Sequence, residues 1–331
     1  MELVCPAGNL PSLKTAVDNG ADAVYFGLRN DTNARHFPGL NFNEKRAREG
    51  IAYAKARGKR VFMAINTYPR PEGWERWRQA VDSAASLAVD ALICADIGVL
   101  DYASQHWPDL NLHLSVQASS TNYEALAFYH EAFAIKRAVL PRVLSLSQVQ
   151  HVVDHSPVEI EIFGFGSLCV MVEGRCILSS YVTGESPNTH GACSPAQFVE
   201  YRETPEGLES RLSGLLTDRY GNNEQAGYPT ICKGRFAVGE NTFYAIEEPT
   251  SLNTLALLPD LLRAGVKAIK IEGRQRTPAY VGQVTKVWRA AIDSCLRDPD
   301  KFIATPLWNN VLDQVSEGAT TTLGPYYRPW Q

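Results

Sequence analysis

The chain has 331 residues, of which 45% are hydrophobic and 21% charged, and its formal net charge is −4. This composition is ordinary for a globular protein with a full core, and the lack of basic runs disfavours a nucleic-acid partner. No apolar run approaches the roughly 18 residues that a bilayer-spanning helix needs, so we expect no stable membrane insertion. The N-terminal residues lack the basic and long apolar regions of a signal peptide, which predicts a cytoplasmic protein.

Short β-branched runs alternate with helical patterns along most of the chain. Strands are predicted at residues 3–4, 23–26, 60–65, 91–94, 112–116, 137–140 and 158–163, with helices between them such as 10–19, 72–87, 123–132 and 146–155. An eighth strand at 268–271 lies between predicted helices at 252–264 and 279–296. Strands that alternate with helices form parallel βαβ units, and eight units predict an α/β fold of the (β/α)8, TIM-barrel-like type. A doubly wound open sheet remains the alternative, because patterning does not prove closure.

Residues 164–250 interrupt this alternation. They are rich in Gly, Ser, Thr, Pro and Asn, which predicts an irregular insertion between strands seven and eight. We therefore divide the chain into residues 1–163 (seven β/α units), 164–250 (a Cys-rich insertion) and 251–331 (the last helix–strand–helix and an irregular tail after residue 296). A segment that leaves the carboxyl end of a barrel strand lies on the active-site face, so we expect the insertion there.

Four of the seven cysteines lie in this insertion: Cys169, Cys176, Cys193 and Cys232. Four thiolates are the ligand set of an iron–sulfur cluster or a structural zinc, whereas disulfides are disfavoured in a reducing compartment. No Cys-x-x-Cys pair is present, so zinc-finger knuckles are absent. The spacing leaves a metal site and ordinary buried cysteines as alternatives. Cys5, Cys94 and Cys295 are scattered singly, and we expect them to be packing residues.

Polar residues at the predicted strand ends are candidates for substrate contacts. They are Arg35 and His36 after the second strand, Asn66 after the third, Asp96 after the fourth, Ser115 and Gln117 at the fifth, Arg142 at the sixth, and Glu272 and Arg274 after the eighth. For any one of them, loop capping or surface solvation is the alternative. Hydrolase signatures such as His-Glu-x-x-His and Gly-x-Ser-x-Gly are absent from the sequence.

Several segments resemble the collagenase-like peptidase family, also called the U-32 peptidases. They are CPAG at 5–8, GADAVYFG at 20–27, GSLC at 166–169, GRC at 174–176 and KIEGR at 270–274. DTNARHF at 31–37, SSYVTGESPN at 179–188, GACSP at 191–195 and EEPTSLN at 247–253 resemble one branch of that family, which acts in oxygen-independent ubiquinone biosynthesis.

The resemblance implies a subunit of a hydroxylase that acts under anaerobic conditions on the aromatic ring of a prenylated quinone precursor. It implies a heterodimer with a paralogue of the same family, and prephenate as an oxygen donor. It also implies a 4Fe-4S cluster on Cys169, Cys176, Cys193 and Cys232, with a role in electron transfer or structural support. As catalytic candidates we take Glu272 and the three arginines Arg35, Arg142 and Arg274, whose guanidinium forks would match a dicarboxylate donor.

Three other functions remain open from the sequence. The chain could be a non-catalytic scaffold whose partner holds the substrate. It could be an RNA-base hydroxylase like other members of the family, although the net charge of −4 disfavours this. It could be a peptidase, but Phe165 stands where relatives have a His before the corresponding Gly, which removes a candidate acid or base.

Overall fold

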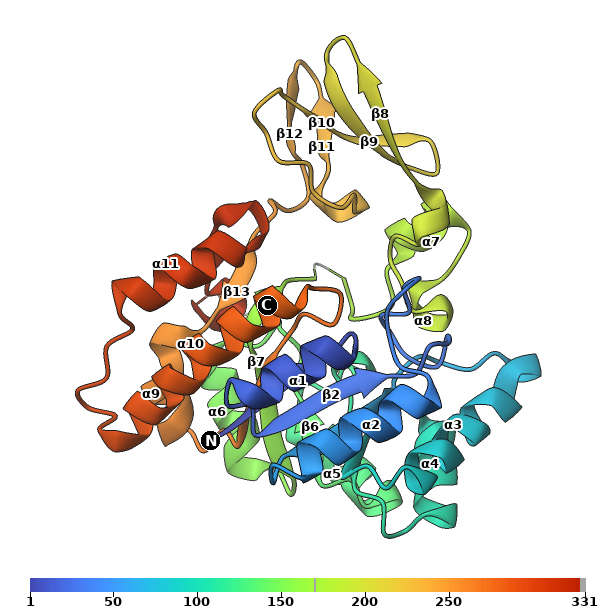
Figure 1. Ribbon diagram of the computed structural model, residues 1–331, viewed down its shortest axis with the longest axis vertical. Coiled ribbons are helices and arrows are strands. Elements are labelled where there is room, and N and C mark those ends of the chain that lie inside the picture. The colour runs from blue at the N-terminus through green and yellow to red at the C-terminus, as the bar shows by residue number, and fades with distance from the viewer. Residues whose placement is uncertain (170, 328–331) are drawn as a thin grey trace.

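The computed structural model describes residues 1–169 and 171–327, and its centre is a barrel of parallel strands surrounded by helices (Figure 1). The barrel strands are β1 (Glu2–Pro6), β2 (Ala23–Gly27), β3 (Arg60–Ile65), β4 (Ala91–Cys94), β5 (Leu112–Leu114), β6 (Arg137–Val139), β7 (Glu159–Ser167) and β14 (Ala268–Ile271). β14 pairs in parallel with both β1 and β7, which closes the sheet. The predicted (β/α)8 barrel is confirmed, and the open sheet is excluded.

Helices cover the outside of the barrel. They are α1 (Leu10–Asp18), α2 (Glu44–Lys55), α3 (Trp74–Ser86), α4 (Ile97–His106), α5 (Tyr123–Phe133), α6 (Leu146–His155), α9 (Leu258–Arg263) and α10 (Pro278–Arg297). Side-chain caps fix where several of them begin: Asn9 accepts from the Ser12 amide at 2.9 Å, and Asp96 accepts from the Val99 amide at 3.0 Å. Asp96, a strand-end candidate from the sequence, therefore serves as a helix cap.

Alternating residues of the barrel strands face two different environments. Residues such as Leu3 and Val24 face outward into the large core beneath the helices, whereas Val4, Tyr25 and Phe62 face the barrel interior. Cys5, Cys94 and Cys295 are buried in the outer core, which confirms that they are packing residues.

Between β7 and β14 the chain forms an arm that projects from the barrel in Figure 1. It contains α7 (Ile177–Thr183), α8 (Pro187–His190), an antiparallel sheet of β8 (Val199–Thr204), β9 (Gly207–Leu212) and β10 (Leu215–Tyr220), and a hairpin of β11 (Arg235–Val238) and β12 (Asn241–Tyr244). The insertion is thus more ordered than its composition suggested. Its turns explain why: Ser213 and Gly214 both have positive φ, as a tight two-residue hairpin turn requires.

Two predicted elements near the C-terminus are wrong. The predicted helix at 252–264 is divided into β13 (Ser251–Asn253), which runs antiparallel to the end of β7, a 3-10 turn, and the short α9. The predicted irregular tail contains α11 (Pro306–Val315), capped by Thr305, and β15 (Thr321–Thr322), which pairs with β13. The last four residues of that tail lie outside the described part. Within the described residues, no helix is long and apolar enough to cross a membrane.

Candidate functional site

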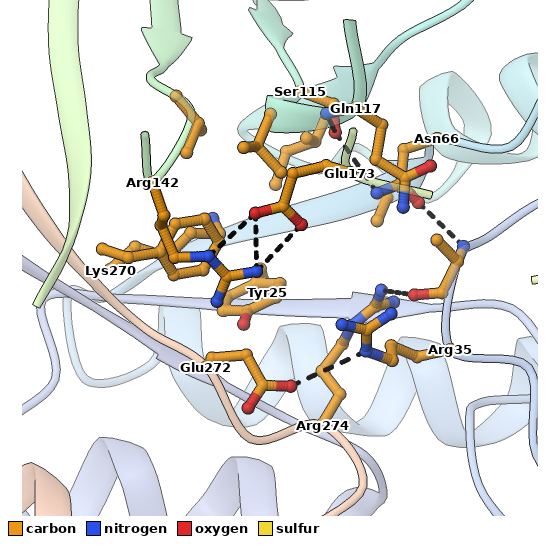
Figure 2. Close-up of a pocket in the computed structure, with 16 residues that line it drawn as sticks. Tyr25, Arg35, Asn66, Ser115, Gln117, Arg142, Glu173, Lys270, Glu272 and Arg274 are labelled. Carbon is orange, nitrogen blue, oxygen red and sulfur yellow. Dashed lines mark hydrogen bonds and ion pairs between the residues drawn. The ribbon is translucent and has the colours of Figure 1, made fainter. Parts of the chain in front are cut away.

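A cavity opens at the carboxyl ends of the barrel strands (Figure 2). The empty space within it, including space that is open to solvent, is about 520 Å³. The residues from β4 to β7 give it an apolar and aromatic side: Ile93, Val116, Val139 and Phe163. The residues on and after β2 and β14 give it a charged side: Arg35, Lys270, Glu272 and Arg274. A cavity with these two sides suits a small ligand that has both a ring and an anionic group.

The Arg142–Glu173 pair joins the barrel to the Cys-bearing loop that follows β7. Arg142 donates from Nε and Nη2 to the two Glu173 oxygens, both at 2.8 Å, and also to the Ser167 carbonyl. Burial lowers the pKa of Arg142, but Glu173, together with Glu272 and Cys169, outweighs this effect and raises the pKa overall. Because Glu173 already occupies its guanidinium fork, Arg142 positions the loop and is not free to clamp a ligand as the sequence suggested.

Arg35 and Arg274 carry charge that the cavity neutralises only in part. Arg35 Nε lies 3.6 Å from Glu272 Oε1, an ion pair longer than a hydrogen bond. Arg274 is 5% exposed and donates to the Asn33 side-chain oxygen at 2.9 Å and to the Ala34 carbonyl. Both acceptors are uncharged, and Arg274 forms no ion pair with the residues that the structure describes.

The protonation equilibria of these two arginines differ accordingly. Burial lowers the pKa of Arg274 to about 10, because little negative charge compensates its guanidinium. Burial also lowers the pKa of Arg35, but Glu272, together with Cys193, Glu173 and Cys169, outweighs this effect and raises the pKa overall. An anionic ligand would supply the negative charge that Arg274 lacks.

Neutral polar groups complete the lining. Asn66 accepts from the Ala34 amide at 2.9 Å, and its own amide donates to Ser115 at 3.3 Å. Gln117 is 4% exposed, and its side-chain oxygen has no hydrogen-bond partner among the described residues. Gly174, in the Cys-bearing loop, lies directly against that amide, since a Cβ added there would be 2.4 Å from the Gln117 oxygen. Gln117 is thus held at the cavity with an acceptor available for a ligand.

The four insertion cysteines lie on segments above this cavity, and each is half-buried and free. Cys176 begins α7, where its sulfur accepts from the Ser179 amide at 3.4 Å, and the Ser179 hydroxyl donates to the Cys193 carbonyl. Lys233, next to Cys232, pairs with Glu317, which also accepts from Arg276 at 3.0 Å. These contacts fix the segments that carry the thiols.

The thiols influence one another electrostatically. Burial raises the pKa of Cys169 to about 11, with a further contribution from Glu173. Burial also raises the pKa of Cys232 to about 12, with contributions from Cys193 and Cys169. Burial raises the pKa of Cys193, which Arg35 opposes and Cys176 reinforces. A metal group bound here would have to displace the thiol protons.

These thiols fit a cluster in their chemistry, since four cysteines are its usual ligand set. Within residues 1–169 and 171–327, no three His, Cys, Asp or Glu side chains are close enough to hold a single metal ion. A tetrahedral zinc would need all four sulfurs at about 2.3 Å from one point. A cubane spreads its ligand sulfurs over separate corners and so requires them farther apart. The residues that would hold it are Cys169, Cys176, Cys193 and Cys232.

The structure brings seven of the nine strand-end candidates together, whereas His36 and Asp96 are not among the residues that line the cavity. Arg35, Asn66, Ser115, Gln117, Arg142, Glu272 and Arg274 all line the cavity. Sequence reasoning missed Tyr25, Glu173 and Lys270, which line it as well. Lys270 carried a signal, because a lysine within an otherwise apolar barrel strand requires a buried partner. Glu173 carried none, since a single acid in a Gly-rich loop is ordinary.

A closed (β/α)8 barrel with a charged cavity at the carboxyl ends of its strands defines the general class of this protein. The chain belongs to Peptidase family U32, whose family model matches residues 8–328. Membership does not by itself define the reaction, since one fold supports many chemistries.

Two curated relatives and one solved structure illustrate the family. The chain is 29% identical over 326 residues to "tRNA hydroxylation protein P1" of Bacillus subtilis, covering 97% of this chain and 70% of that protein. It is 31% identical over 314 residues to "tRNA hydroxylation protein P" of Escherichia coli, covering 88% and 68%. The solved structure of "the U32 Peptidase Mk0906" has a TM-score of 0.52 at 12% identity, covering 84% of this chain and 94% of that one, which shows a shared fold. The chain thus spans about two thirds of the length of these curated relatives.

Proposed function

We propose that this chain is a subunit of an oxygen-independent hydroxylase that acts on the aromatic ring of a prenylated ubiquinone precursor, the role of UbiU. Its partner would be a UbiV-like paralogue. The observation that carries the proposal is the cavity itself, which combines an apolar side, a buried Arg274 without an ion-pair partner among the described residues, and four thiols on the segments above it. The hydroxylation proteins among its relatives support a hydroxylase, and the segments that resemble the ubiquinone branch motivate the choice of substrate.

Ring hydroxylation inserts one oxygen atom and removes two electrons from the ring. Without O₂, an oxygen donor and an electron acceptor must both be supplied. Prephenate would be the donor, because its carboxylates match the guanidinium of Arg274. Arg35, whose ion pair with Glu272 is long, would bind the second carboxylate. The side-chain oxygen of Gln117, which has no partner among the described residues, would accept a hydrogen bond from a ligand hydroxyl. Ile93, Val139 and Phe163 would contact the rings.

A 4Fe-4S cluster on the four cysteines would supply electron transfer or structural support. The chain's own residues set where it would lie, since the Arg142–Glu173 pair holds the loop between Cys169 and Cys176 over the cavity. Gly174 and Gln117 provide a second contact between that loop and the barrel.

The partner surface would include α7. Its residues Ile177 and Tyr181 are 70% and 91% exposed and lie one helical turn apart. Ile177 is the residue that directly follows Cys176. Large apolar side chains exposed together are typical of interaction surfaces. A paralogue bound there would shield the thiols from solvent.

An RNA-base hydroxylase is the second candidate, because both relatives named above are tRNA hydroxylation proteins. The net charge of −4 argues against it, since binding to a phosphate backbone depends on basic surface. A peptidase finds less support. Ser115 is the only serine or threonine among the described residues that line the cavity, and none of these residues is a histidine that could activate it. A non-catalytic scaffold finds less support as well, because it would not need a buried arginine such as Arg274 in a ligand-sized cavity.

The test is anaerobic reconstitution of the chain with and without its paralogue, followed by incubation with a prenylphenol, prephenate and a chemical electron acceptor. We expect about four iron and four sulfide per chain and a hydroxylated prenylphenol product only when both subunits are present. Single Cys→Ser variants at the four positions should lose the cluster. Full cluster occupancy and full activity in all four variants would refute the assigned ligands, and hydroxylated tRNA in place of the prenylphenol would favour the second candidate.

A further inference from the structure

Lys270 is a cavity residue that the proposed binding of donor and ring leaves unused. It lies on β14, is 5% exposed, and lines the cavity beside Tyr25 (Figure 2). Its Nζ donates to Glu161 Oε1 at 2.7 Å and lies 3.9 Å from the centre of the Tyr25 ring. An ammonium has three protons, and the described residues provide a hydrogen-bond acceptor for one of them.

Glu161 behind Lys270 already has a second cationic partner. Its other oxygen accepts from Arg137 at 3.1 Å, and Arg137 also pairs with Glu2 and Glu159 on the side away from the cavity. The negative charge of Glu161 is therefore also balanced by Arg137, on the side away from the cavity, and it would remain paired if Lys270 became neutral. Of the groups in this buried ion network, Lys270 is the one that lines the cavity.

The other ionisable groups of the cavity are poorly suited to transfer a proton. Guanidinium groups hold their protons throughout the physiological range, which excludes the three arginines. The Tyr25 hydroxyl donates its proton to the Ile271 carbonyl at 2.8 Å, and burial raises its pKa. Glu272 is paired with Arg35, and Glu173 with Arg142. Among the described lining residues, Lys270 is left as the group that can both hold and release a proton.

We propose that Lys270 is the acid–base residue of this cavity, which donates a proton from Nζ to an oxygen of the bound ligand and regains one from solvent through the open mouth. The proton moves with no change in electron count, and the resulting neutral amine stays beside a Glu161 still paired with Arg137. The inference rests on the proposed function only in placing a reacting ligand in the cavity.

The electrostatic surroundings support this role. Burial lowers the pKa of Lys270 from 10.5, and the ion pair with Glu161 opposes the effect only in part. The charged and titratable groups that face it are Tyr25 of β2, His113 of β5, Arg137 of β6, Glu161 of β7 and Arg274 after β14. A lysine that releases its proton more readily than usual is a better acid for a ligand oxygen.

Lys270→Arg is the informative variant, because it keeps the charge and the ion pair but cannot release a proton. We expect kcat for ring hydroxylation by the complete complex to fall by about 100-fold or more with little change in KM, and the alkaline limb of the pH–rate profile to disappear. Arg137→Lys is the matched control, since it alters the same ion network without touching the cavity, and it should keep the wild-type profile. A wild-type rate and alkaline limb in Lys270→Arg would overturn the inference.

Two further measurements cover failure of folding and failure of the proposed function. If Lys270→Arg does not fold, the double variant Lys270→Met/Glu161→Gln removes both charges of the pair, and wild-type kcat in it would overturn the inference. If the wild-type complex hydroxylates no prenylphenol, the proposed function fails, and acetic anhydride labelling of the wild-type chain as a function of pH decides the inference alone. A labelling midpoint for Lys270 below 10.5 supports it, and one at or above 10.5 overturns it.

Discussion

Replacing Glu173 by Gln tests whether a buried ion pair holds the Cys-bearing loop on the barrel. The Glu173 carboxylate receives two hydrogen bonds from Arg142, and the two side chains are only 11% and 4% exposed. Gln keeps the shape of the side chain and one acceptor oxygen but removes the negative charge. Arg142 would then remain buried with a full positive charge and no ion-pair partner among the described residues, since Glu272 acts on it only from a greater distance.

The magnitude follows from that burial. Removing one partner of a buried ion pair destabilises a protein by about 3–5 kcal/mol, because the remaining charge is left uncompensated. Water screens this pair little, since both groups are nearly inaccessible. The acceptor oxygen that Gln retains places the expected loss at the lower end of that range.

The assay is urea denaturation of the cluster-free chain, which gives the free energy of unfolding. The control is Glu44→Gln, because Glu44 pairs with Arg48 at 2.5 Å on the surface, where the two side chains are 66% and 54% exposed. An exposed pair of this kind contributes about 0–1 kcal/mol. If Glu173→Gln lost no more stability than Glu44→Gln, the Arg142–Glu173 pair would not anchor the loop.

Three further predictions concern the loop, the barrel interior and α7. Gly174→Ala should lose more stability, and bind prephenate more weakly, than the control Gly58→Ala, because both glycines have positive φ but only Gly174 has a neighbour, Gln117, within 4 Å of the added Cβ; equal effects in calorimetry would contradict this. Burial lowers the pKa of His113 to about 3, so its contribution to stability is complete above the unfolded-state pKa of 6.5 and is lost as the pH falls toward 3. The free energy of unfolding should therefore fall by up to about 1.4 kcal/mol per pH unit over that window, and a His113→Gln variant with the same slope in urea titrations would refute the assignment. Tyr181→Ser should weaken binding of the paralogue by more than the control Leu307→Ser, which changes another exposed apolar residue, on α11, and unchanged affinity would remove α7 from the interface.

The barrel could be predicted because its strands are apolar runs at regular intervals, which local patterning reveals. The same reasoning placed Arg35, Glu272 and Arg274 near one another, since strand ends in a barrel converge on one face. It did not reveal that Arg142 is occupied by Glu173. That pair joins residues 31 positions apart, and its formation depends on how the loop folds over the barrel.

The failures have a common physical cause, which is that tertiary contacts outweigh local periodicity. Leu252 fits a helical pattern, but pairing with Gly166 of β7 draws it into a strand. The tail after residue 296 was expected to be irregular, but α11 begins at Pro306 within it, since proline is favoured in the first turn of a helix. Lys270 lies in the predicted strand at 268–271, but its role could not be predicted, because its partner Glu161 lies 109 residues away in the sequence.

The most direct test of the central proposal is mass spectrometry of a prenylphenol incubated anaerobically with the chain and its paralogue, in the presence of prephenate and a chemical electron acceptor. The proposal predicts a product heavier by one oxygen atom, formed only by the complete complex and lost in an Arg274→Gln variant. An unchanged prenylphenol, or an equal yield of product from Arg274→Gln, would contradict it.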